Sequence, residues 1–474
     1  MSEPTAHPRI RPHAAAGARP WSTFLLTSMA VFLVSLDASV VIAAFPALRD
    51  TFGSVSAATL SWSLNAYTIV YAALLIPVGR LADLHGHRRV FVAGVLLFAA
   101  ASGACGLAAS AEQLIAARVV QAVGAALLTP ASLALVLRAF PAERRVAIVG
   151  LWSAVGALAA AIGPSAGSWI IDHASWRWVF LINVPLGLLA AGLAMRRIPE
   201  SSAADSGARP DLPGIALLIA GVALIAGGIV AHEAGYTMAQ ALGLGIAGAA
   251  ALAVFARWAR GRSNAALDLS LFEDRSLRWA SAASLVFGAG FSAMFLAAFL
   301  FLMGVWGWSQ SLAGLALTPG PLMVIPIAVL SSRWERIVGR QALLVTGGLI
   351  FAASHGLLAG YASPEADYLT LWLPSQILTG VAIGLVLPAL SAAIVAGLPT
   401  QRFGVGSGVS NALRQLGGSL GTAVAVALIG RADAPIEAYR LLFAVIAACG
   451  LAVALMALAM GRPVTPTVPA ARLR

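Results

Sequence analysis

The chain has 474 residues, of which 60% are hydrophobic and 10% are charged, and its mean hydropathy is +0.88. A soluble protein cannot bury that much apolar surface, so the composition excludes the soluble classes and predicts a membrane protein. All 30 basic residues are arginine, and the formal net charge is +11. A P-loop and a pyridoxal Schiff base each require a lysine, so both kinds of site are excluded.

The apolar sequence is divided into runs that are long enough to cross a bilayer, at about 20 residues each. Fourteen such runs are expected as helices, at 23–47, 57–79, 89–110, 113–138, 146–170, 176–195, 213–232, 237–257, 279–302, 311–331, 341–361, 369–393, 404–429 and 437–461. An even number of spans places both termini on one side. If that side is cytoplasmic, 24 arginines fall at inner loops and tails, four at outer loops and two within helices, as the positive-inside rule requires.

Two longer polar linkers, Arg196–Leu212 and Arg257–Arg278, bracket the seventh and eighth runs. The chain is therefore expected to hold two six-helix bundles with two helices inserted between them. The expected parts are a cytoplasmic tail at 1–22, a six-helix bundle at 23–195, linkers and two inserted helices at 196–278, a second bundle at 279–461 and a cytoplasmic tail at 462–474.

The two bundles read as internal repeats. ARVVQAVGAALLTPA at 117–131 aligns without gaps to SQILTGVAIGLVLPA at 375–389, and Gly150 with GPSAG at 163–167 matches Gly404 with GGSLG at 417–421. In this alignment Arg118 is matched by Gln376 and Asp83 by Arg336, so the second half lacks both charges. Paired six-helix halves with a central site are the plan of many secondary transporters.

A charged turn, GRLADLHGHRR at Gly79–Arg89, separates the second and third runs. Gly79 and Gly86 permit close approach and a tight bend. The pattern G-R-L-A-D-x-x-G-x-R-R resembles the loop between helices 2 and 3 of major facilitator superfamily transporters. The residues of the pattern that we take as candidates are Gly79, Arg80, Asp83, Gly86, Arg88 and Arg89.

Four further segments extend the resemblance over nearly the whole chain. They are LDASVVIAAFPAL at 36–48, RVVQAVGAA at 118–126, the segment 150–168 and SGVSNALRQLGGSLG at 407–421. Together they look like the fourteen-helix drug:proton antiporter branch of that superfamily, although Ser39, Ile42, Ala122, Ala159 and Ser168 depart from its usual residues. The resemblance implies an all-α major facilitator fold and export by exchange.

Three formal charges lie deep within the expected helices: Asp37, Arg118 and Arg414. An unpaired charge in hydrocarbon costs several kcal/mol. Counting residues along each helix places Asp37 and Arg118 at similar depths, within reach of an arginine side chain. Either they form a static pair that joins helices 1 and 4, or Asp37 exchanges protons as Arg118 moves. The resemblance favours the second interpretation.

Arg414 has Asn411 three residues before it and Gln415 next to it, and Asn411 can share its helix face. These residues either satisfy backbone groups between the repeats or line a central cavity. A second cavity arginine would argue against a site that selects only cations.

The resemblance also implies a latch, in which Asp83 pairs with the start of helix 13 near Gly404, assisted by Arg80 and Arg89. The free N–H groups of a helix N-terminus suit an anion. The alternative is a solvated acid that balances nearby arginines.

In helix 5 the antiporter motif comprises Gly150, Gly163, Pro164 and Gly167. Gly163-Pro164 is expected to break the hydrogen-bond ladder of this helix, and Gly156 and Gly167 are expected to allow close contact with a helix of the other half. The remaining cavity candidates are Trp62, Asn65, Tyr67, Gln121, Gln376, Asn411, Arg414, Gln415 and, outside the quoted motifs, Asn183. His355, alone in mid-helix, and Cys105 and Cys449 are expected to be structural.

We therefore expect a non-enzymatic, proton-coupled exporter of amphipathic organic compounds in a bacterial inner membrane. No cofactor or metal is expected, since the proton gradient supplies the energy. The expected partners are the small substrate, the bilayer and a periplasmic adaptor, with no nucleic acid, and the expected state is a monomer. A transporter of lipid or cell-envelope precursors and a non-transporting sensor or assembly protein are the alternatives.

Overall fold

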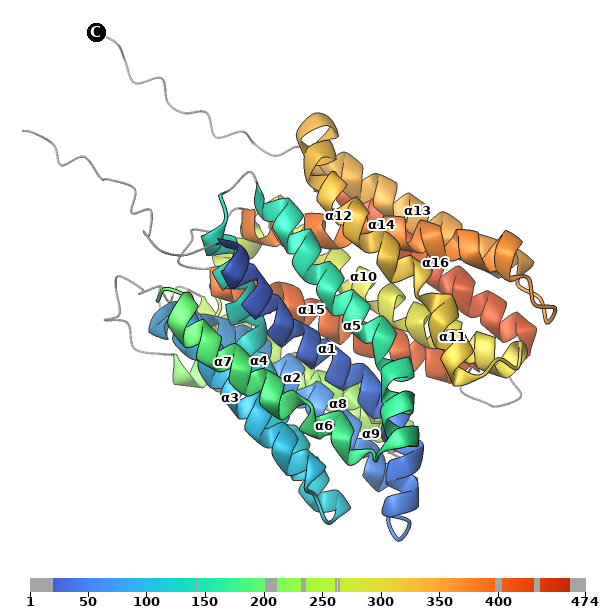
Figure 1. The fold of residues 1–474 in the computed structure, drawn as a ribbon. Helices are drawn as coiled ribbons and strands as arrows, with labels where there is room; N and C mark the ends of the chain where they lie inside the picture. Colours follow the sequence, from blue (N-terminus) through green and yellow to red (C-terminus); the bar gives the residue numbers. More distant parts are fainter. Residues whose placement is uncertain are drawn as a thin grey trace, which may run out of the picture.

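A computed structural model describes residues 20–141, 144–200, 211–231, 236–260, 262, 265–396, 403–429 and 435–460. The expected tail at 462–474 lies outside these residues, as do nearly all of the tail at 1–22 and the middle of the first linker. Every element within the described residues is a helix, as the composition predicts (Figure 1).

The N-terminal bundle consists of α1 (Pro20–Thr51), α2 (Ala57–His85), α3 (His87–Gly106), α4 (Ala111–Ala139), α5 (Arg145–His173), α6 (Arg177–Leu181) and α7 (Asn183–Arg197). The inserted pair is α8 (Leu212–Val230) and α9 (Met238–Ala259). After a 3-10 turn, η2 (Leu269–Glu273), the C-terminal bundle consists of α10 (Arg275–Leu300), the π-helix η3 (Phe301–Val305), α11 (Gln310–Leu317), α12 (Pro319–Val338), α13 (Arg340–Tyr361), the π-helix η4 (Tyr368–Trp372), α14 (Leu373–Ala396), α15 (Phe403–Ile429) and α16 (Ile436–Ala459).

Helices occupy all fourteen runs expected from the sequence. Within the described residues, 13 spans are long and apolar enough to cross a membrane, and α5 contains the shorter apolar helix Ala147–Gly156. The sixth run is divided into α6 and α7, and the tenth is divided into α11 and α12 before Pro319. These interruptions were not expected from hydropathy, which reports apolar length but not the continuity of backbone hydrogen bonds.

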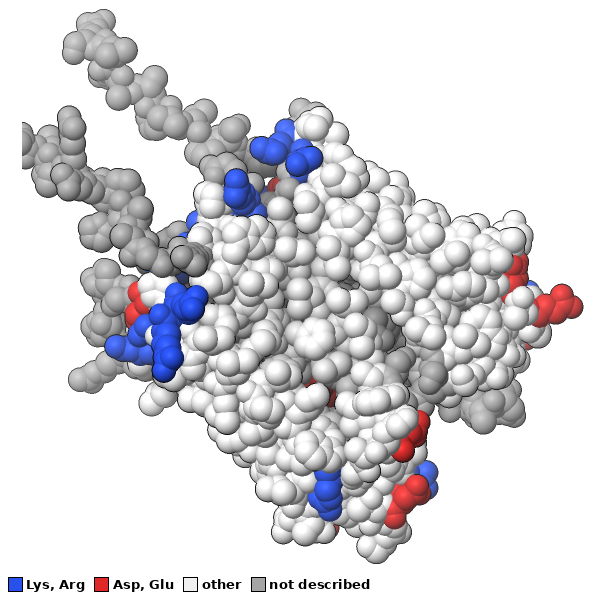
Figure 2. Space-filling model, in the orientation of Figure 1, with Lys and Arg blue, Asp and Glu red and all other residues white. Residues whose placement is uncertain are grey.

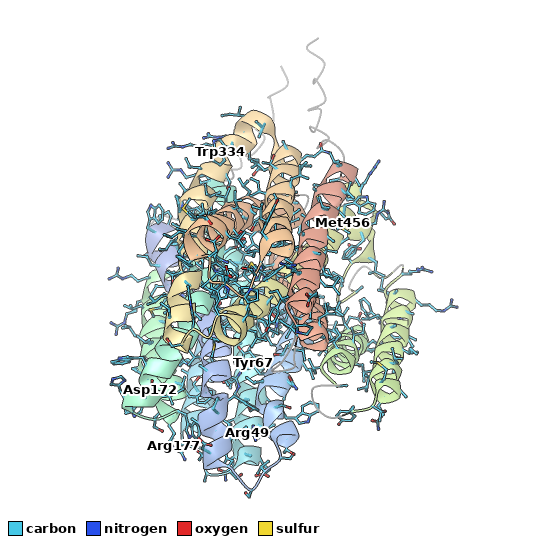
Figure 3. The ribbon with its side chains drawn as sticks, turned by 90° about the vertical axis from the view of Figure 1, so that its right-hand side faces the viewer. Arg49, Tyr67, Asp172, Arg177, Trp334 and Met456 are labelled. Carbon is cyan, nitrogen blue, oxygen red and sulfur yellow. The ribbon has the colours of Figure 1, made fainter. Side chains whose placement is uncertain are left out.

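The two bundles pack internally in corresponding ways. α3 packs on α4 and α1 on α5 in the first, and α13 packs on α14 and α10 on α15 in the second. The inserted α8 lies against α2 and α9 (Figure 1). Figure 3 places Trp334 and Met456 near one end of the molecule, Arg49, Asp172 and Arg177 near the other, and Tyr67 between them.

The inserted pair is fastened by Asp211, which is 7% exposed and caps the start of α8. Its carboxylate accepts hydrogen bonds from the Trp258 indole at 3.0 Å and from the Ala266 backbone at 3.2 Å. Burial raises the pKa of Asp211, but these hydrogen bonds, that of Gly214 and the charge of Arg262 together lower it below its ordinary value. One carboxylate thus joins α8, α9 and the linker that follows.

Glycines determine which helices approach closely. A Cβ on Gly167 would lie 2.7 Å from the Val40 side chain, and one on Gly163 would overlap Ser39, so both glycines face α1 of the same bundle. In the second bundle Gly417 and Gly421 of α15 meet the Leu285 and Ala289 backbones of α10 in the same way.

One expectation for α5 is wrong. Gly156 and Gly167 face α1 of their own bundle rather than the other half. Gly150 contacts the other half, where a Cβ would lie 2.8 Å from the side chains of Ala328 and Pro388. The helix continues through Gly163 and Pro164 to His173, so the missing N–H of the proline interrupts the hydrogen-bond ladder without ending the helix.

The α3–α4 crossing supplies a direct test of this packing. A Cβ on Gly124 would lie 2.5 Å from the Phe98 backbone nitrogen, so Gly124→Ala should destabilise the protein by about 1–3 kcal/mol through overpacking. Gly243→Ala on α9 is the matched control, because nothing lies within 4 Å of the added Cβ. Thermal unfolding in detergent measures both variants, and equal unfolding temperatures would contradict the packing described.

Candidate functional site

A buried ion pair joins α1 to α4. Arg118 Nη1 lies 2.5 Å from Asp37 Oδ2, and the two residues are 1% and 2% exposed. Asp37 lies past the middle of α1, while Arg118 lies two turns into α4, which runs in the opposite direction. The expectation that their depths coincide is therefore confirmed.

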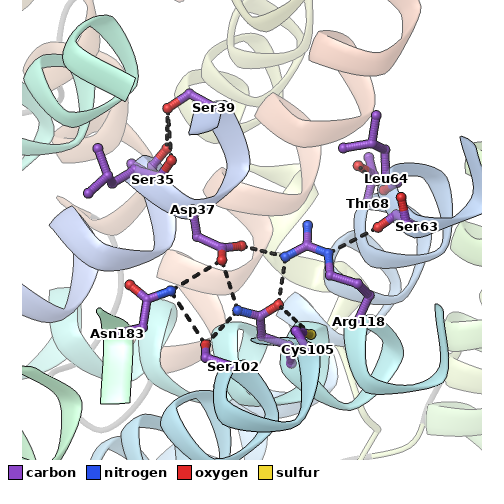
Figure 4. Close-up of polar contacts among 12 residues, drawn as sticks. Ser35, Asp37, Ser39, Ser63, Leu64, Thr68, Ser102, Cys105, Arg118 and Asn183 are labelled. Atoms are coloured by element: carbon purple, nitrogen blue, oxygen red, sulfur yellow. Dashed lines mark hydrogen bonds and ion pairs between the residues drawn. The ribbon is translucent and has the colours of Figure 1, made fainter. Parts of the chain in front are cut away.

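The second oxygen of Asp37 accepts from two amides (Figure 4). Gln121 Nε2 donates to Asp37 Oδ1 at 2.9 Å, and Asn183 Nδ2 donates to the same oxygen at 3.3 Å. Gln121 also donates to Ser102 Oγ at 2.6 Å, and its own Oε1 accepts from Arg118 at 2.6 Å. Both oxygens of Asp37 are thus occupied by donors, which is the arrangement that suits the ionised carboxylate.

Arg118 is held from two further directions. Its Nε donates to the Ser63 carbonyl at 3.0 Å, and its guanidinium lies 4.1 Å from the centroid of the Tyr67 ring. Tyr67 stacks on Tyr71 with ring centroids 5.9 Å apart, and Tyr71 OH donates to Thr129 at 3.1 Å. The stacked tyrosines therefore cover the ion pair on the α2 side.

Three residues expected to line the cavity belong instead to this cluster, and one of them is Tyr67, which covers Arg118. Gln121 is completely buried against Asp37, and Asn183 is 1% exposed in the same place. Ser102 was not predicted, because a serine in an apolar helix is too common to single out. The turn between α6 and α7 places Asn183 at the start of α7, where it is buried. Hydropathy does not predict this turn.

Asp83 lies against the start of α15. Its Oδ1 accepts from the Gly404 backbone at 2.9 Å and its Oδ2 from the Val405 backbone at 3.0 Å. Gly79 and Gly404 pack backbone to backbone, so that a Cβ on either would overlap the other. Gly86 turns the chain between α2 and α3 with φ +98°, which favours glycine. The contact expected of Asp83 is therefore present.

The arginines of the loop do not all serve this contact. Arg88 Nε and Arg89 Nε lie 3.4 and 3.5 Å from Glu200, just beyond α7, so the expected assistance from Arg89 is wrong. Among the described residues no ion pair of Arg80 is found. The neighbours of Asp83 are instead His87, whose Nε2 lies 3.0 Å from Asp83 Oδ1, and Arg138, whose Nη1 lies 3.5 Å from His87 Nδ1. His87 occupies a variable position of the motif, so the pattern could not identify it.

Three of the remaining candidates lie in two further places. Arg414 Nη2 donates to Asn411 Oδ1 at 2.5 Å, which confirms that they share a face, and Asn411 Nδ2 donates to the Ser407 carbonyl at 2.9 Å. Gln376 and Thr379 of α14 are the polar residues of a pocket in the C-terminal bundle. Its other lining residues are Phe291, Met294, Phe295, Ala298, Leu317, Gly320, Pro321, Val324 and Ile383.

Trp62 and Asn65 lie outside both places. The Trp62 ring packs edge-on against Tyr236, 6.4 Å away, at the inserted pair, so the expectation that it lines the central cavity is wrong. Asn65 is 7% exposed, and its Nδ2 has no acceptor within the described chain. Gln415 is half-buried, and its carbonyl accepts from Ser419 at 3.2 Å. His355 is buried and contacts the Phe351 carbonyl at 2.9 Å, as a structural residue would.

Comparison with known proteins places this architecture in a family. Residues 27–422 match the sequence profile of the Major Facilitator Superfamily. The chain is 32% identical to the cephamycin export protein of Amycolatopsis lactamdurans, over 94% of this chain and 93% of that protein. It is 34% identical to the puromycin resistance protein of Streptomyces alboniger, over 86% of this chain and 81% of that protein.

The fold is also found among solved structures. The human organic anion transporter MFSD10 superposes with a TM-score of 0.65, covering 91% of this chain and 99% of that one at 16% identity, a similarity that concerns the fold alone. Taken with the helical repeat, the helix 2–3 loop and the relatives that export antibiotics and other drugs, these matches show that the chain belongs to the Major Facilitator Superfamily of membrane transporters, in its drug:proton antiporter branch.

Proposed function

We propose that this protein exports amphipathic organic compounds from the cytoplasm across a bacterial inner membrane, in exchange for protons, by alternating access. The observation that carries the proposal is the ion pair of Asp37 with Arg118. It is buried within the membrane-spanning helices and includes a carboxylate, a group that can take up a proton. The export activities of the relatives support the class of substrate.

The orientation follows from charge. Arginines gather at the end of the molecule where α1 begins, as Figure 2 shows in the orientation of Figure 1. Short loops rich in arginine remain on the cytoplasmic side of a membrane. The Asp83 end and both termini are therefore cytoplasmic in this proposal.

Proton exchange acts through the partners of Asp37. When Asp37 takes up a proton, its attraction for Arg118 is lost, and a guanidinium buried without a counter-charge is strongly destabilised. Arg118 then relies on the Ser63 carbonyl, Gln121 Oε1 and the Tyr67 ring. Because these partners belong to α2 and α4, protonation releases α1 from α4 and favours a rearranged state.

The Asp83 contact supplies the second requirement, which is a barrier that opens and closes. It joins α2 of one bundle to α15 of the other, beside the glycine contact of Gly79 with Gly404. Gly150 makes the corresponding contact of α5 with α12 and α14. Both contacts hold the cytoplasmic ends of the bundles together, and both must separate before substrate can enter from that side.

Asp37→Asn tests the coupling. The amide cannot release a proton, so accumulation of transported dye against its gradient should fall to the level of protein-free liposomes, while dye-for-dye exchange continues. The measurement is uptake into inside-out proteoliposomes with and without an imposed pH gradient, using cationic, neutral and anionic fluorescent compounds, with fluorescein and rhodamine 123 among them. Asp50→Asn, which removes an exposed carboxylate from the same helix, should leave uptake unchanged.

Wild-type uptake that is equal with and without the pH gradient would eliminate proton exchange. Normal uphill transport by the Asp37→Asn variant would show that the coupling site lies elsewhere.

Asp83→Ala tests the barrier. The substitution removes two hydrogen bonds to a carboxylate, each worth about 1.5–3 kcal/mol, and should shift the population toward a state with separated cytoplasmic ends. Spin labels at the exposed positions Leu81 and Trp334 report the distance between the bundles. The expected result is a longer and broader distance distribution.

Asp274→Ala is the matched control for this variant. Asp274 accepts from the Leu277 backbone at 2.7 Å at the start of α10, so it caps a helix without joining the two bundles. Its removal should not change the distance. The same distribution in wild type and Asp83→Ala would contradict the assigned role of Asp83.

A further inference from the structure

Arg414 is a cation within a membrane-spanning helix that has no acidic partner in the described chain. One of its N–H groups donates to the neutral Asn411 side chain. No other donor of its guanidinium meets an acceptor among the described residues, and none of the ion pairs found there includes it. Arg118, by contrast, is paired with a carboxylate and is only 1% exposed, whereas Arg414 is half-buried.

The described helices consequently have a net positive charge within the membrane interior. Asp37, Arg118 and Arg414 are the charges deep within the described helices, so ionised Asp37 leaves one positive charge and protonated Asp37 leaves two. The Asp37 carboxylate is 2% exposed and is already occupied by Arg118, Gln121 and Asn183. A cationic compound would therefore find no free carboxylate at this depth among the described residues.

Arg414 lies on α15, which packs against α10 of its own bundle and against α2 of the other. Its backbone packs against Gly288 of α10. On the other side, Leu413 of α15 and Tyr71 of α2 pack against the same apolar cluster. A charged donor thus lies on a helix at the interface between the bundles, where a transport pathway must pass.

We propose that the transported compound is an organic acid, whose oxyanion pairs with Arg414 at the interface between the two bundles. The inference rests on the proposed export function and specifies its substrate class. The planar guanidinium suits a carboxylate, which it can bind through two parallel N–H groups. Binding also supplies the counter-charge that the described helices do not provide.

Two dyes with the same ring system test the charge preference. Fluorescein is an anionic xanthene at neutral pH, and rhodamine 123 is a cationic one. Equilibrium binding of each dye to the purified full-length protein in nanodiscs should favour fluorescein. Loss of a charge-assisted hydrogen bond of about 1.5–3 kcal/mol corresponds to a factor of roughly ten or more, so Arg414→Gln should weaken fluorescein binding at least about tenfold.

Two further variants separate charge from folding. Arg414→Lys keeps the positive charge and should retain the preference for fluorescein, and binding of rhodamine 123 to Arg414→Gln should stay equal or increase. Arg336→Gln removes an exposed arginine near the cytoplasmic end of α12 and should leave both affinities unchanged. A ratio of two affinities measured on one variant is insensitive to the fraction of protein that is folded.

Four results would overturn the inference. The wild-type protein could bind both dyes equally, bind rhodamine 123 more tightly, or bind neither dye. The fourth is an unchanged dye preference in Arg414→Gln. Proteoliposome uptake distinguishes a failure of the organic-acid inference from a failure of the proposed export function. Proton-driven uptake of rhodamine 123 without uptake of fluorescein would retain the exporter and reject the acid. Arg414-dependent binding of fluorescein without response to a pH gradient would retain the acid and reject proton exchange.

Discussion

The ion pair between Asp37 and Arg118 is the interaction on which the rest of the N-terminal bundle depends. Neither charge could remain buried alone, because an unpaired charge in this environment costs several kcal/mol. The pair therefore imposes the positions of its neighbours: α2 must present the Ser63 carbonyl, α3 must present Ser102, and α7 must begin at Asn183. Five helices meet at one carboxylate, so any change in its protonation is felt by all of them.

Glycine placement sets how the two bundles can move against each other. The helix that begins at Arg145 and its repeat at Phe403 use their first glycines, Gly150 and Gly404, for contact with the opposite bundle. Their later glycines pack on the first helix of their own bundle, as Gly163 does on α1 and Gly417 on α10. The same spacing thus produces one contact between the bundles and one contact within each bundle, as the proposed movement of two halves about a central site would require.

Much of this arrangement could be predicted from the sequence, because membrane burial leaves few alternatives. Long apolar runs must be helices, and deep charges of opposite sign must pair. Asp37 and Arg118 were found by these arguments, whereas the contact of Asp83 was implied by the family resemblance. The direction of each side chain could not be predicted in this way, because it depends on the rotation of each helix about its axis. Tyr67 was expected in the cavity and covers Arg118, and Trp62 was expected there and meets Tyr236. His87 and Arg138 come from opposite ends of two helices and meet at Asp83 only in three dimensions.

The repeats have diverged at the place where chemistry is expected. Position 118 is arginine in the first half and its counterpart is Gln376 in the second, while Gln121 corresponds to Thr379. In both bundles a serine of the third helix meets this second position, Ser102 with Gln121 at 2.6 Å and Ser354 with Thr379 at 2.6 Å. The first cluster is charged and sealed, whereas Gln376 and Thr379 line a pocket. The charged cluster and the neutral pocket thus occupy corresponding positions in the two repeats. In the exchange proposed above, coupling between these two places passes through the interface between the bundles, where α15 packs against α2.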